Sequence, residues 1–355
     1  MKFLITNFPG LRPLLAEELA ARLNLKAVSD ARVRGSELLW VQTSDPAGLL
    51  QLRVAEDVFV EVDTLKLTGQ NSDLKAIGVL LGRPEGLSAA LRAYAHLTGA
   101  VVPARAQYRI VAQADDASWR KYRRLDMQTM AEAGLARARP AWRLNSEEAP
   151  IEIWLHLVGR TLHVSLRLTS GAHRSRGGRT VERAAALRPT IAAAMVMATR
   201  PADEDVFLDP MCGCGTILLE RALAGRHGLL LGGDIDAGAV RAALANFGPR
   251  HKPVRIAKMD ARSLPLEDAS VDVVAANLPW GRQIGREADL PDLYARSLKE
   301  MARVLRPGGR VVLLTSEWRL LKTIIKEQSA LKLTRTIPNI EVLGRRADMI
   351  VLSCR

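Results

Sequence analysis

Cysteine is scarce in this chain, and so are long apolar runs. The 355 residues include three cysteines, which are too few for a disulfide framework. Two of them form Cys212-Gly-Cys214 without companion ligands, so we expect no zinc site and no other bound metal. No apolar run approaches the ~20 residues of a membrane helix, and Asn7 and Pro9 interrupt the short one after Lys2. We therefore expect a cytoplasmic globular protein without a signal peptide.

Acidic residues are outnumbered: 38 Asp and Glu face 51 Lys and Arg, a formal net charge of +13. This surplus favours a polyanionic partner, most often nucleic acid, although a basic proteome or simple solubility is an alternative. The basic residues interleave with Trp119 and Tyr122 in a helix predicted over 119–139, with Ser118 as its N-cap. That arrangement suits phosphate neutralisation and base stacking, whereas a solvated helix with a core tryptophan is the alternative. The expected RNA contacts are Arg120, Lys121, Arg123, Arg124, Arg174, Arg176 and Arg282.

Composition changes near residue 170. The preceding residues mix strand and helix patterns and carry no cluster of catalytic residue types, so this α+β part is expected to bind or to scaffold. Residues 170–182 are polar and rich in glycine and arginine, as in a linker. Strands and helices then alternate, which predicts a mostly parallel, doubly wound α/β sheet. Segments 332–337 and 349–353 fit an antiparallel hairpin at its edge.

A glycine-containing loop organises this second half. Residues 206–220 read V-F-L-D-P-M-C-G-C-G-T-I-L-L-E, the pattern of a buried strand, a tight loop and the first turn of a helix. A dinucleotide fingerprint would need a third glycine where Leu218 stands, and the chain has neither G-K-S nor G-K-T. A carboxylate at Asp209 would repel pyrophosphate but suits a cationic ligand such as S-adenosylmethionine. For a lone pair of glycines, a structural turn is the alternative.

Two further carboxylates follow predicted strands. Asp234 in G-G-D-I-D can accept both hydroxyls of a ribose, while Asp236 is better placed as the N-cap of the next helix. Asp260 in A-K-M-D-A can accept the exocyclic amine of adenine while the Ala261 amide donates to the ring. A lone aspartate after a strand is more often a cap or turn residue. Three such residues on adjacent strand ends favour a ligand site.

The fourth strand ends in N-L-P-W-G, residues 277–281. Pro279 holds Leu278 extended, so backbone carbonyls turn toward the pocket beside the Asn277 side-chain carbonyl. Two acceptors and the flat ring of Trp280 suit an exocyclic amine on a planar base. An ordinary proline turn with Trp280 in the core is the alternative.

These motifs occur in order, and together they closely resemble class I S-adenosylmethionine-dependent methyltransferases acting on amino nitrogens of nucleobases. Residues 183–195, R-A-A-A-L-R-P-T-I-A-A-A-M, look like the helix before the glycine loop in the THUMP-domain tRNA guanine-N2 methyltransferases. The resemblance implies a ferredoxin-like α+β segment at 1–65 and a THUMP RNA-binding domain at 66–169, the latter gripping the acceptor end of tRNA. A linker at 170–182 and a Rossmann-like methyltransferase domain at 183–355 would follow. The resemblance is specific from the linker onward and looser before it.

The resemblance also implies a protein that binds S-adenosylmethionine and tRNA and methylates N2 of a guanosine. We expect it to be a monomer. Leucine in the second place of N-L-P-W looks more like the branch acting on guanosine 6 than the one acting on guanosine 10. Adenine N6 in DNA, another amine in ribosomal RNA, or an RNA-binding protein without catalysis remain alternatives. The catalytic residues implied are Asn277, Leu278, Pro279 and Trp280. The cofactor-binding residues implied are Thr190, Asp209, Pro210, Cys212, Gly213, Gly215, Thr216, Asp234, Ile235, Asp260, Ala261 and Asn277. Cys214 stands where the family often has serine.

Overall fold

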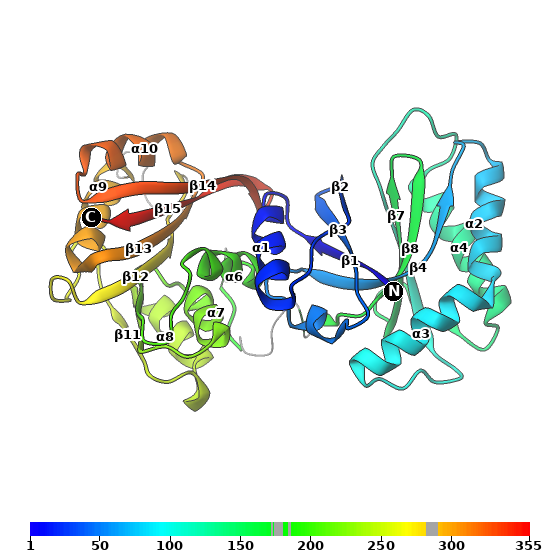
Figure 1. The fold of residues 1–355 in the computed structure, drawn as a ribbon, viewed down its shortest axis with the longest axis horizontal. Helices are drawn as coiled ribbons and strands as arrows, with labels where there is room; N and C mark the ends of the chain where they lie inside the picture. The colour runs from blue at the N-terminus through cyan, green and yellow to red at the C-terminus, as the bar shows by residue number, and fades with distance from the viewer. Residues whose placement is uncertain (172, 174–179, 184–185, 282–289) are drawn as a thin grey trace. The chain divides into compact units, whose positions relative to one another are not determined.

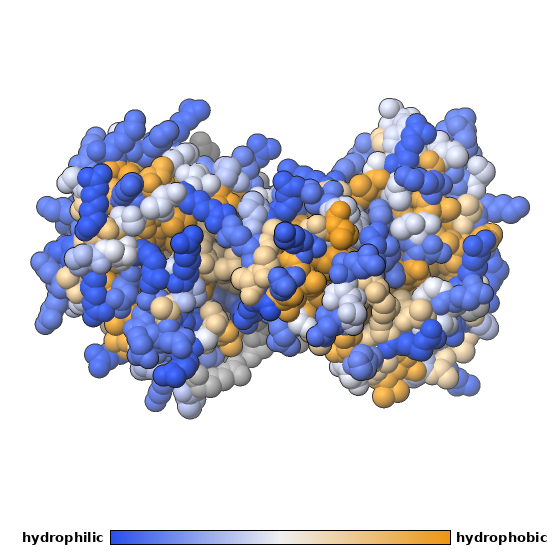
Figure 2. Space-filling view, in the orientation of Figure 1, coloured by the Kyte–Doolittle hydropathy of each residue, from blue (hydrophilic) through white to orange (hydrophobic). Residues whose placement is uncertain are grey.

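The chain divides into two compact units, Met1–Arg174 and Ser175–Arg355, each built around its own sheet. The computed structural model describes residues 1–355 except 172, 174–179, 184–185 and 282–289 (Figure 1). In the space-filling view, hydrophilic side chains cover much of the visible face of each unit, with smaller hydrophobic areas between them (Figure 2). In the described part of the chain, no helix has the length and apolar character to cross a membrane.

The first unit holds an eight-stranded mixed sheet in the order β2-β3-β1-β4-β8-β7-β5-β6. Its elements are β1 (Lys2–Asn7), α1 (Arg12–Leu23), β2 (Ser29–Val33), β3 (Ser36–Gln42), a 3-10 helix (Ala47–Gln51), β4 (Asp57–Lys66), α2 (Ser72–Gly82), α3 (Pro84–Thr98), β5 (Gln107–Ala114), α4 (Arg124–Ala138), β6 (Arg143–Leu144), β7 (Ile151–Val158) and β8 (Thr161–Arg167). β4 pairs with β1 on one side and with β8 on the other. The sheet is therefore continuous across residue 66, where the sequence places the boundary between its two N-terminal regions; that boundary stays a prediction.

The predicted basic helix is shorter than expected. α4 begins at Arg124, not at Trp119, and the Asp126 carboxylate caps it by accepting the Arg123 backbone N–H at 2.7 Å. The preceding residues are held elsewhere: the Lys121 amide donates to the Gly69 carbonyl at 2.9 Å. Helical periodicity was misleading because these tertiary hydrogen bonds outweigh local propensity.

The second unit is the doubly wound α/β sheet that the sequence predicts, in the order β11-β10-β9-β12-β13-β15-β14. Its elements are α6 (Pro189–Ala198), β9 (Val206–Asp209), α7 (Thr216–Ala224), β10 (Leu229–Asp234), α8 (Ala237–Asn246), a 3-10 turn (Pro249–His251), β11 (Val254–Lys258), β12 (Val271–Asn277), α9 (Leu290–Val304), β13 (Leu305–Thr315), α10 (Trp318–Glu327), β14 (Leu331–Val342) and β15 (Arg345–Cys354). β9 to β13 run parallel, and β15 pairs antiparallel with β13 and β14, which confirms the predicted hairpin at the edge.

Helices cover both faces of this sheet. α6, α7 and α8 lie on one face, and α9 and α10 lie on the other (Figure 1). The face under α9 and α10 holds a core that includes Leu208, Leu298, Leu313 and Ile350, all of them inaccessible to solvent. Because β strands buried on both faces need continuous apolar sequence, this core explains the short apolar runs. The sequence interpretation omitted α10, although its apolar residues recur at helical spacing.

Candidate functional site

The strand order of the second unit reverses at β9. Its two neighbours are β10 and β12: the chain continues from β10 outward to β11 and from β12 outward to β13. Open α/β sheets bind ligands outside the carboxyl ends of the strands at such a switch point. Asp209, Asp234 and Asn277 are the last residues of β9, β10 and β12, so the structure brings these predicted residues to one edge.

The glycine loop after β9 leaves room for a ligand at one position and is tightly packed at another. Gly213 and Gly215 have φ of 54° and 84°, a backbone conformation that disfavours side chains. A Cβ on Gly213 would meet no atom within 4 Å, whereas a Cβ on Gly215 would lie 2.9 Å from the Phe247 ring. The loop then opens α7 at Thr216, as predicted. Both cysteines of the loop are buried, and burial raises the pKa of the Cys212 thiol; the predicted cofactor contact of Cys212 stays a prediction.

Asp209 is a buried carboxyl group. It is 1% exposed; one oxygen accepts the Met211 amide at 3.1 Å, and in the described part of the chain Oδ2 has no hydrogen-bond partner. Burial raises the pKa of Asp209 well above its ordinary value, and the neighbouring Asp234 carboxylate adds to the shift. A buried carboxyl group with an unused oxygen is poised to ionise when a cation is placed beside it.

Asp234 is held in place by backbone donors on both oxygens. Its Oδ2 accepts the Gly213 amide at 2.9 Å and its Oδ1 accepts the Asp236 amide at 2.9 Å. An ionised carboxylate offers about four lone-pair sites, so two hydroxyls can still be accepted. Asp236 caps α8 through the Gly238 amide at 2.7 Å, which confirms its predicted role. Ile235 between them is 58% exposed and offers an apolar contact.

Asp260 is already engaged by its own neighbour. The Arg262 guanidinium donates to both carboxylate oxygens at 2.8–3.1 Å, and the Arg262 amide adds a contact at 2.9 Å. These bonds hold the pKa of Asp260 below its ordinary value. A ligand amine at Asp260 must therefore share the carboxylate with Arg262. Ala261 is buried beside it, and Thr190 is buried at the start of α6; their predicted ligand contacts stay predictions.

The N-L-P-W segment has a side-chain oxygen available to accept a hydrogen bond and a backbone that is fixed to the neighbouring strand. The Asn277 side-chain oxygen is buried and has no hydrogen-bond partner among the residues that the structure describes. Leu278 is 1% exposed, and its amide donates to the Leu314 carbonyl at 3.0 Å, which ties the segment to β13. A buried carbonyl oxygen left open is costly unless a ligand donates to it. This oxygen is therefore the prime candidate for binding an amine.

Tyr294 supports the same segment from α9. Its hydroxyl is 2.7 Å from the Pro279 carbonyl oxygen, to which it donates, and 2.9 Å from Thr315 Oγ1. Burial raises the pKa of Tyr294 to about 12, and the Glu317 carboxylate contributes in the same direction, so the phenol stays a donor at neutral pH. The Pro279 carbonyl thus has one lone pair occupied and one left. The sequence interpretation missed Tyr294 because nothing in a helical tyrosine predicts a contact with a turn in another element.

Trp280 lies beside this acceptor and is largely enclosed. The side chain is 6% exposed, and the Arg345 guanidinium lies 5.9 Å from the ring centroid. No residue that the structure describes forms a hydrogen bond with the indole Nε1. A base that stacks on Trp280 would therefore have to enter beside Arg345. Its predicted stacking role stays a prediction.

Asn246 is a second residue that the sequence interpretation missed. Its side-chain nitrogen donates to the carbonyls of Cys214 and Val181 at 3.0 and 2.9 Å, and its oxygen accepts the amides of Thr180 and Val181 at 2.8 and 2.9 Å. The side chain is 3% exposed. One amide at the end of α8 therefore joins the glycine loop to the segment where the predicted linker ends.

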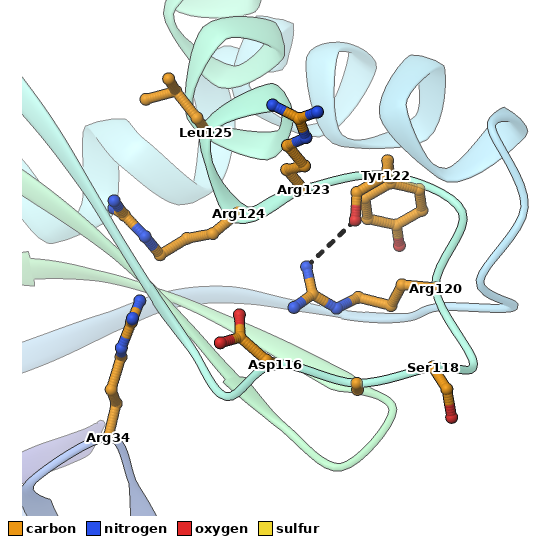
Figure 3. Close-up of a pocket in the computed structure, with 9 residues that line it drawn as sticks. Arg34, Asp116, Ser118, Arg120, Tyr122, Arg123, Arg124 and Leu125 are labelled. Carbon is orange, nitrogen blue, oxygen red and sulfur yellow. Dashed lines mark hydrogen bonds between the residues drawn. The ribbon is translucent and has the colours of Figure 1, made fainter.

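A basic pocket of about 650 Å³ lies in the first unit (Figure 3). Its lining residues are Arg34, Asp116, Ala117, Ser118, Arg120, Tyr122, Arg123, Arg124 and Leu125. Arg120 and Arg124 donate to the backbone carbonyls of Asp115 and Ala112 at 2.7 and 2.9 Å. Carbonyl contacts orient these guanidinium groups without neutralising their charge, which suits an anionic ligand.

The pocket contains three of the predicted RNA-binding residues and one that was not predicted. Arg120, Arg123 and Arg124 line it, and Lys121 is exposed nearby without lining it. Arg34 comes from the turn between β2 and β3, whose amide donates to Asp115 at 2.9 Å. No sequence signal connects Arg34 with Arg120, because hydrogen bonds between the β2–β3 turn and the side chains of Gln113 and Asp115 bring them together. The remaining predicted contacts, Arg174, Arg176 and Arg282, lie outside the described residues.

The second unit also fits the predicted cofactor, S-adenosylmethionine. Asp209 offers an unused buried oxygen, Gly213 leaves open space in the loop, and Asp234 retains lone pairs. Acidic groups around a glycine loop suit a ligand that carries positive charge. In the described residues no cluster of His, Cys, Asp and Glu could hold a metal ion.

Comparison with protein families covers the second unit. Residues 176–343 match the family described as RMKL-like, methyltransferase domain. Mouse tRNA (guanine(6)-N(2))-methyltransferase THUMP3 is 32% identical over 194 residues, 50% of this chain and 37% of the relative. Bovine U6 snRNA (guanine-N(2))-methyltransferase THUMPD2 is 35% identical over 181 residues, 50% and 34%. Thermus thermophilus tRNA (guanine(6)-N2)-methyltransferase is 36% identical over 155 residues, 42% and 46%. The chain spans about a third to a half of these relatives' length.

Solved structures match the chain over its whole length. TrmN from Thermus thermophilus superposes with a TM-score of 0.81 at 24% identity, covering 100% of this chain and 99% of that one. A putative methyltransferase complexed with SAH, SMU.472, gives a TM-score of 0.73 at 15% identity, covering 99% and 97%. At this level of identity the likeness concerns the fold. Together with the family match it confirms the predicted α/β architecture with a Rossmann-like methyltransferase domain.

Proposed function

We propose that this chain, whose residues 176–343 are a methyltransferase domain of the RMKL-like type, transfers a methyl group from S-adenosylmethionine to N2 of a guanosine in RNA. One observation carries the proposal: at the switch point of the sheet, three residues before Trp280, the buried Asn277 side-chain oxygen lacks a hydrogen-bond partner within the described ranges. An exocyclic amine supplies the donor that this oxygen lacks, and a base carries that amine on a planar ring.

In this proposal one set of residues binds the cofactor and another binds the amine of the substrate. Asp234 would accept the ribose hydroxyls, and Asp209 would ionise beside the cation. The bound cofactor supplies an electrophilic methyl group on sulfonium. Asn277 and the remaining lone pair of the Pro279 carbonyl would accept the amine hydrogens, so that the nitrogen lone pair points at the methyl group. Much of the acceleration would come from holding the reacting atoms roughly 3–3.5 Å apart; no strong general base is needed, because the nitrogen becomes acidic only as it is methylated.

We propose tRNA as the substrate and guanosine 6 of the acceptor stem as the favoured target. Two of the relatives are named for that position, and a third is named for guanine N2 in U6 snRNA. The first unit supports an RNA substrate through the basic pocket, with its arginines held by carbonyl groups. Because an acceptor-stem guanosine is paired, its base must leave the stem to reach Asn277. Guanosine 10 of tRNA is the second candidate position.

The test is methyl transfer from labelled S-adenosylmethionine to unmodified tRNA transcripts, with the product nucleotide mapped. We expect N2-methylguanosine at position 6. Asn277→Ala should lower kcat on the order of 10²-fold while leaving cofactor affinity nearly intact, because the lost contact orients the reacting amine. Asp234→Ala is the matched variant on the cofactor side and should weaken cofactor binding first, as calorimetry would show.

The outcomes separate the parts of the proposal. Product at another guanosine of tRNA would change only the target position. Transfer to adenine N6 of DNA in a competition assay would overturn the assignment to guanine. Near-normal turnover by Asn277→Ala would remove that residue from catalysis. Binding of tRNA without any transfer, with cofactor affinity intact, would favour another RNA or an RNA-binding protein without catalysis.

A further inference from the structure

The hairpin of β14 and β15 extends past the edge of the sheet where the site lies. β15 runs antiparallel to β13, and Asp348 is the register partner of Thr315, the last residue of β13. β15 begins three residues earlier, at Arg345. At about 3.3 Å per residue, Arg345 stands roughly 10 Å beyond the end of β13. The hairpin tip, residues 342–346, therefore overhangs the carboxyl edge of the sheet.

A direct contact joins this tip to the site. The Arg345 guanidinium lies over the Trp280 ring, 5.9 Å from its centroid, and Trp280 is three residues after Asn277. At the turn, Leu343 is 57% exposed with a φ of 49°, and Gly344 has a φ of 76°. Paired strands support the tip on both sides, with Val342 opposite Arg345. The tip is thus a structured projection at the mouth of the site.

The tip carries two adjacent positive charges: Glu341 is the register partner of Arg346, whereas the apolar Val342 is the register partner of Arg345. Arg345 and Arg346 are adjacent and exposed, and in the described ranges the structure records no salt bridge for either guanidinium. Arginine presents a planar set of donors that matches phosphate. Two such groups on a hairpin beside an amine-binding site suit the backbone of the substrate nucleic acid rather than its base.

When the target nucleotide flips out of the stem, the RNA backbone on either side of it lies close to the hairpin tip. A nucleotide that swings into the site takes its base inward, while the flanking phosphates stay at the mouth. Resting on the proposed function, we infer that the hairpin tip binds the phosphates flanking the target guanosine, with Arg345 as the main phosphate ligand. In the absence of RNA the Arg345 guanidinium rests on Trp280, and it leaves that ring when the phosphate and the base arrive.

The test compares RNA binding by Arg345→Ala with that by Lys332→Ala. Lys332 is an exposed cation on the same hairpin but pairs with Ser353, at the opposite end of β15, so it controls for the loss of one positive charge. Arg345→Lys keeps the positive charge but replaces the planar guanidinium group with an ammonium group. Affinity for an unmodified tRNA transcript is measured by fluorescence anisotropy over a salt series, cofactor affinity by calorimetry, and methyl transfer in parallel.

We expect Arg345→Ala to weaken tRNA binding severalfold and to reduce the slope of log K against log salt by about one, as loss of one phosphate contact requires. Lys332→Ala should match the wild type, Arg345→Lys should regain most of the affinity, and cofactor affinity should stay unchanged in all three. An unchanged affinity and slope in Arg345→Ala would overturn the inference. So would an equal loss in Lys332→Ala, since any positive charge on the hairpin would then account for the effect. A salt slope in Arg345→Lys as low as that in Arg345→Ala would also overturn it, since the retained charge would then play no part in binding.

Failure of the proposed function would look different. A wild-type protein that methylates no guanosine would overturn that function, yet its RNA affinity and salt slope would still be measurable in every variant. Those RNA-binding data alone therefore test whether the hairpin tip binds phosphate.

Discussion

Burial of the Asp209 carboxyl group lowers the stability of the ligand-free fold, but the same carboxyl group favours the binding of a cationic ligand. Its carboxyl is 1% exposed with one oxygen unpartnered, and its pKa is raised well above the ordinary value mainly by burial. A group with a raised folded-state pKa stabilises the fold below its unfolded-state pKa, about 3.9. That stabilisation is lost as pH rises through the folded-state value. The ligand-free protein thus gives up stability at neutral pH at a position that suits a cation.

Asp209→Asn should therefore separate stability from cofactor binding. We expect the thermal midpoint of the ligand-free variant at pH 7 to equal or exceed that of the wild type. We also expect the loss of stability from about pH 4 upward to be smaller, because the variant has no carboxyl to ionise. S-adenosylmethionine affinity should fall on the order of tenfold or more, as removing a buried counter-charge predicts. Calorimetry measures the cofactor affinity, and thermal unfolding at several pH values measures the stability. If Asp209→Asn bound S-adenosylmethionine as tightly as the wild type does, Asp209 would have no role in cofactor binding.

Tyr294 is a positioning residue for the amine-binding segment. Its hydroxyl contacts the Pro279 carbonyl and Thr315 Oγ1, and the raised pKa keeps it protonated. Tyr294→Phe should lower kcat roughly tenfold and leave the KM for S-adenosylmethionine nearly unchanged, because a shift of the acceptor misplaces the amine and not the cofactor. Thr315→Val removes the other partner of the same hydroxyl and should have the smaller effect. Equal kcat in Tyr294→Phe and wild type would show that the bond only stabilises the fold.

At the scale of elements, the loop before α4 is held by one buried carboxylate. Asp73 accepts the Tyr122 hydroxyl at 2.7 Å, the Thr68 amide and hydroxyl, and the Gly69 amide. Burial alone would raise the pKa of Asp73, but these hydrogen bonds outweigh it and lower the pKa. Burial, and then the same carboxylate, raise the pKa of Tyr122. Through Tyr122, Asp73 fixes the segment that carries Arg120 and Arg123 into the basic pocket.

Tyr122→Phe should weaken this loop in a pH-dependent way. The lost bond to a charged acceptor should lower the stability of the first unit at pH 7 by about 1.5–3 kcal/mol. A carboxyl group whose pKa is lowered in the folded state stabilises the fold at a pH above its unfolded-state pKa. That stabilisation is lost as the pH falls through the folded-state pKa. The gap between variant and wild type should therefore narrow below about pH 4, as urea unfolding at each pH would show. A gap that stays constant with pH would exclude Asp73 as the source.

The sequence could predict which residues end a strand or cap a helix, whereas it could not predict the side-chain contacts that depend on packing or on a particular rotamer. Asp209, Asp234 and Asn277 follow apolar strands, so their gathering at one edge followed from the alternation of strands and helices. Asp236 was identified as a cap for the same local reason. Tyr294 at Pro279, Asn246 at Cys214 and Arg34 at the basic pocket depend on how separate elements pack. Even Arg262, two residues from Asp260, depended on a rotamer that no sequence pattern specifies.

At the scale of the whole molecule, the net charge of +13 predicts how RNA binding responds to salt. If the protein neutralises about four phosphates, RNA affinity should fall roughly 10²-fold between 50 and 200 mM salt. Binding of S-adenosylmethionine should change little over this range, because its site is partly buried and screened less. Anisotropy titrations with tRNA and calorimetry with the cofactor make the comparison. An RNA affinity that does not depend on salt would refute a phosphate-based interface.

The order of the last strands has a consequence for synthesis on the ribosome. β15 lies between β13 and β14 in the sheet, although β14 comes first in the chain. While the nascent chain is growing, β14 emerges before β15, the strand that links it to the rest of the sheet. Until residues 345–354 have emerged, β13 presents an open apolar edge, which is the kind of surface on which newly made strands associate wrongly. We therefore expect chains arrested near residue 344 to be captured by chaperones far more readily than chains released after β15.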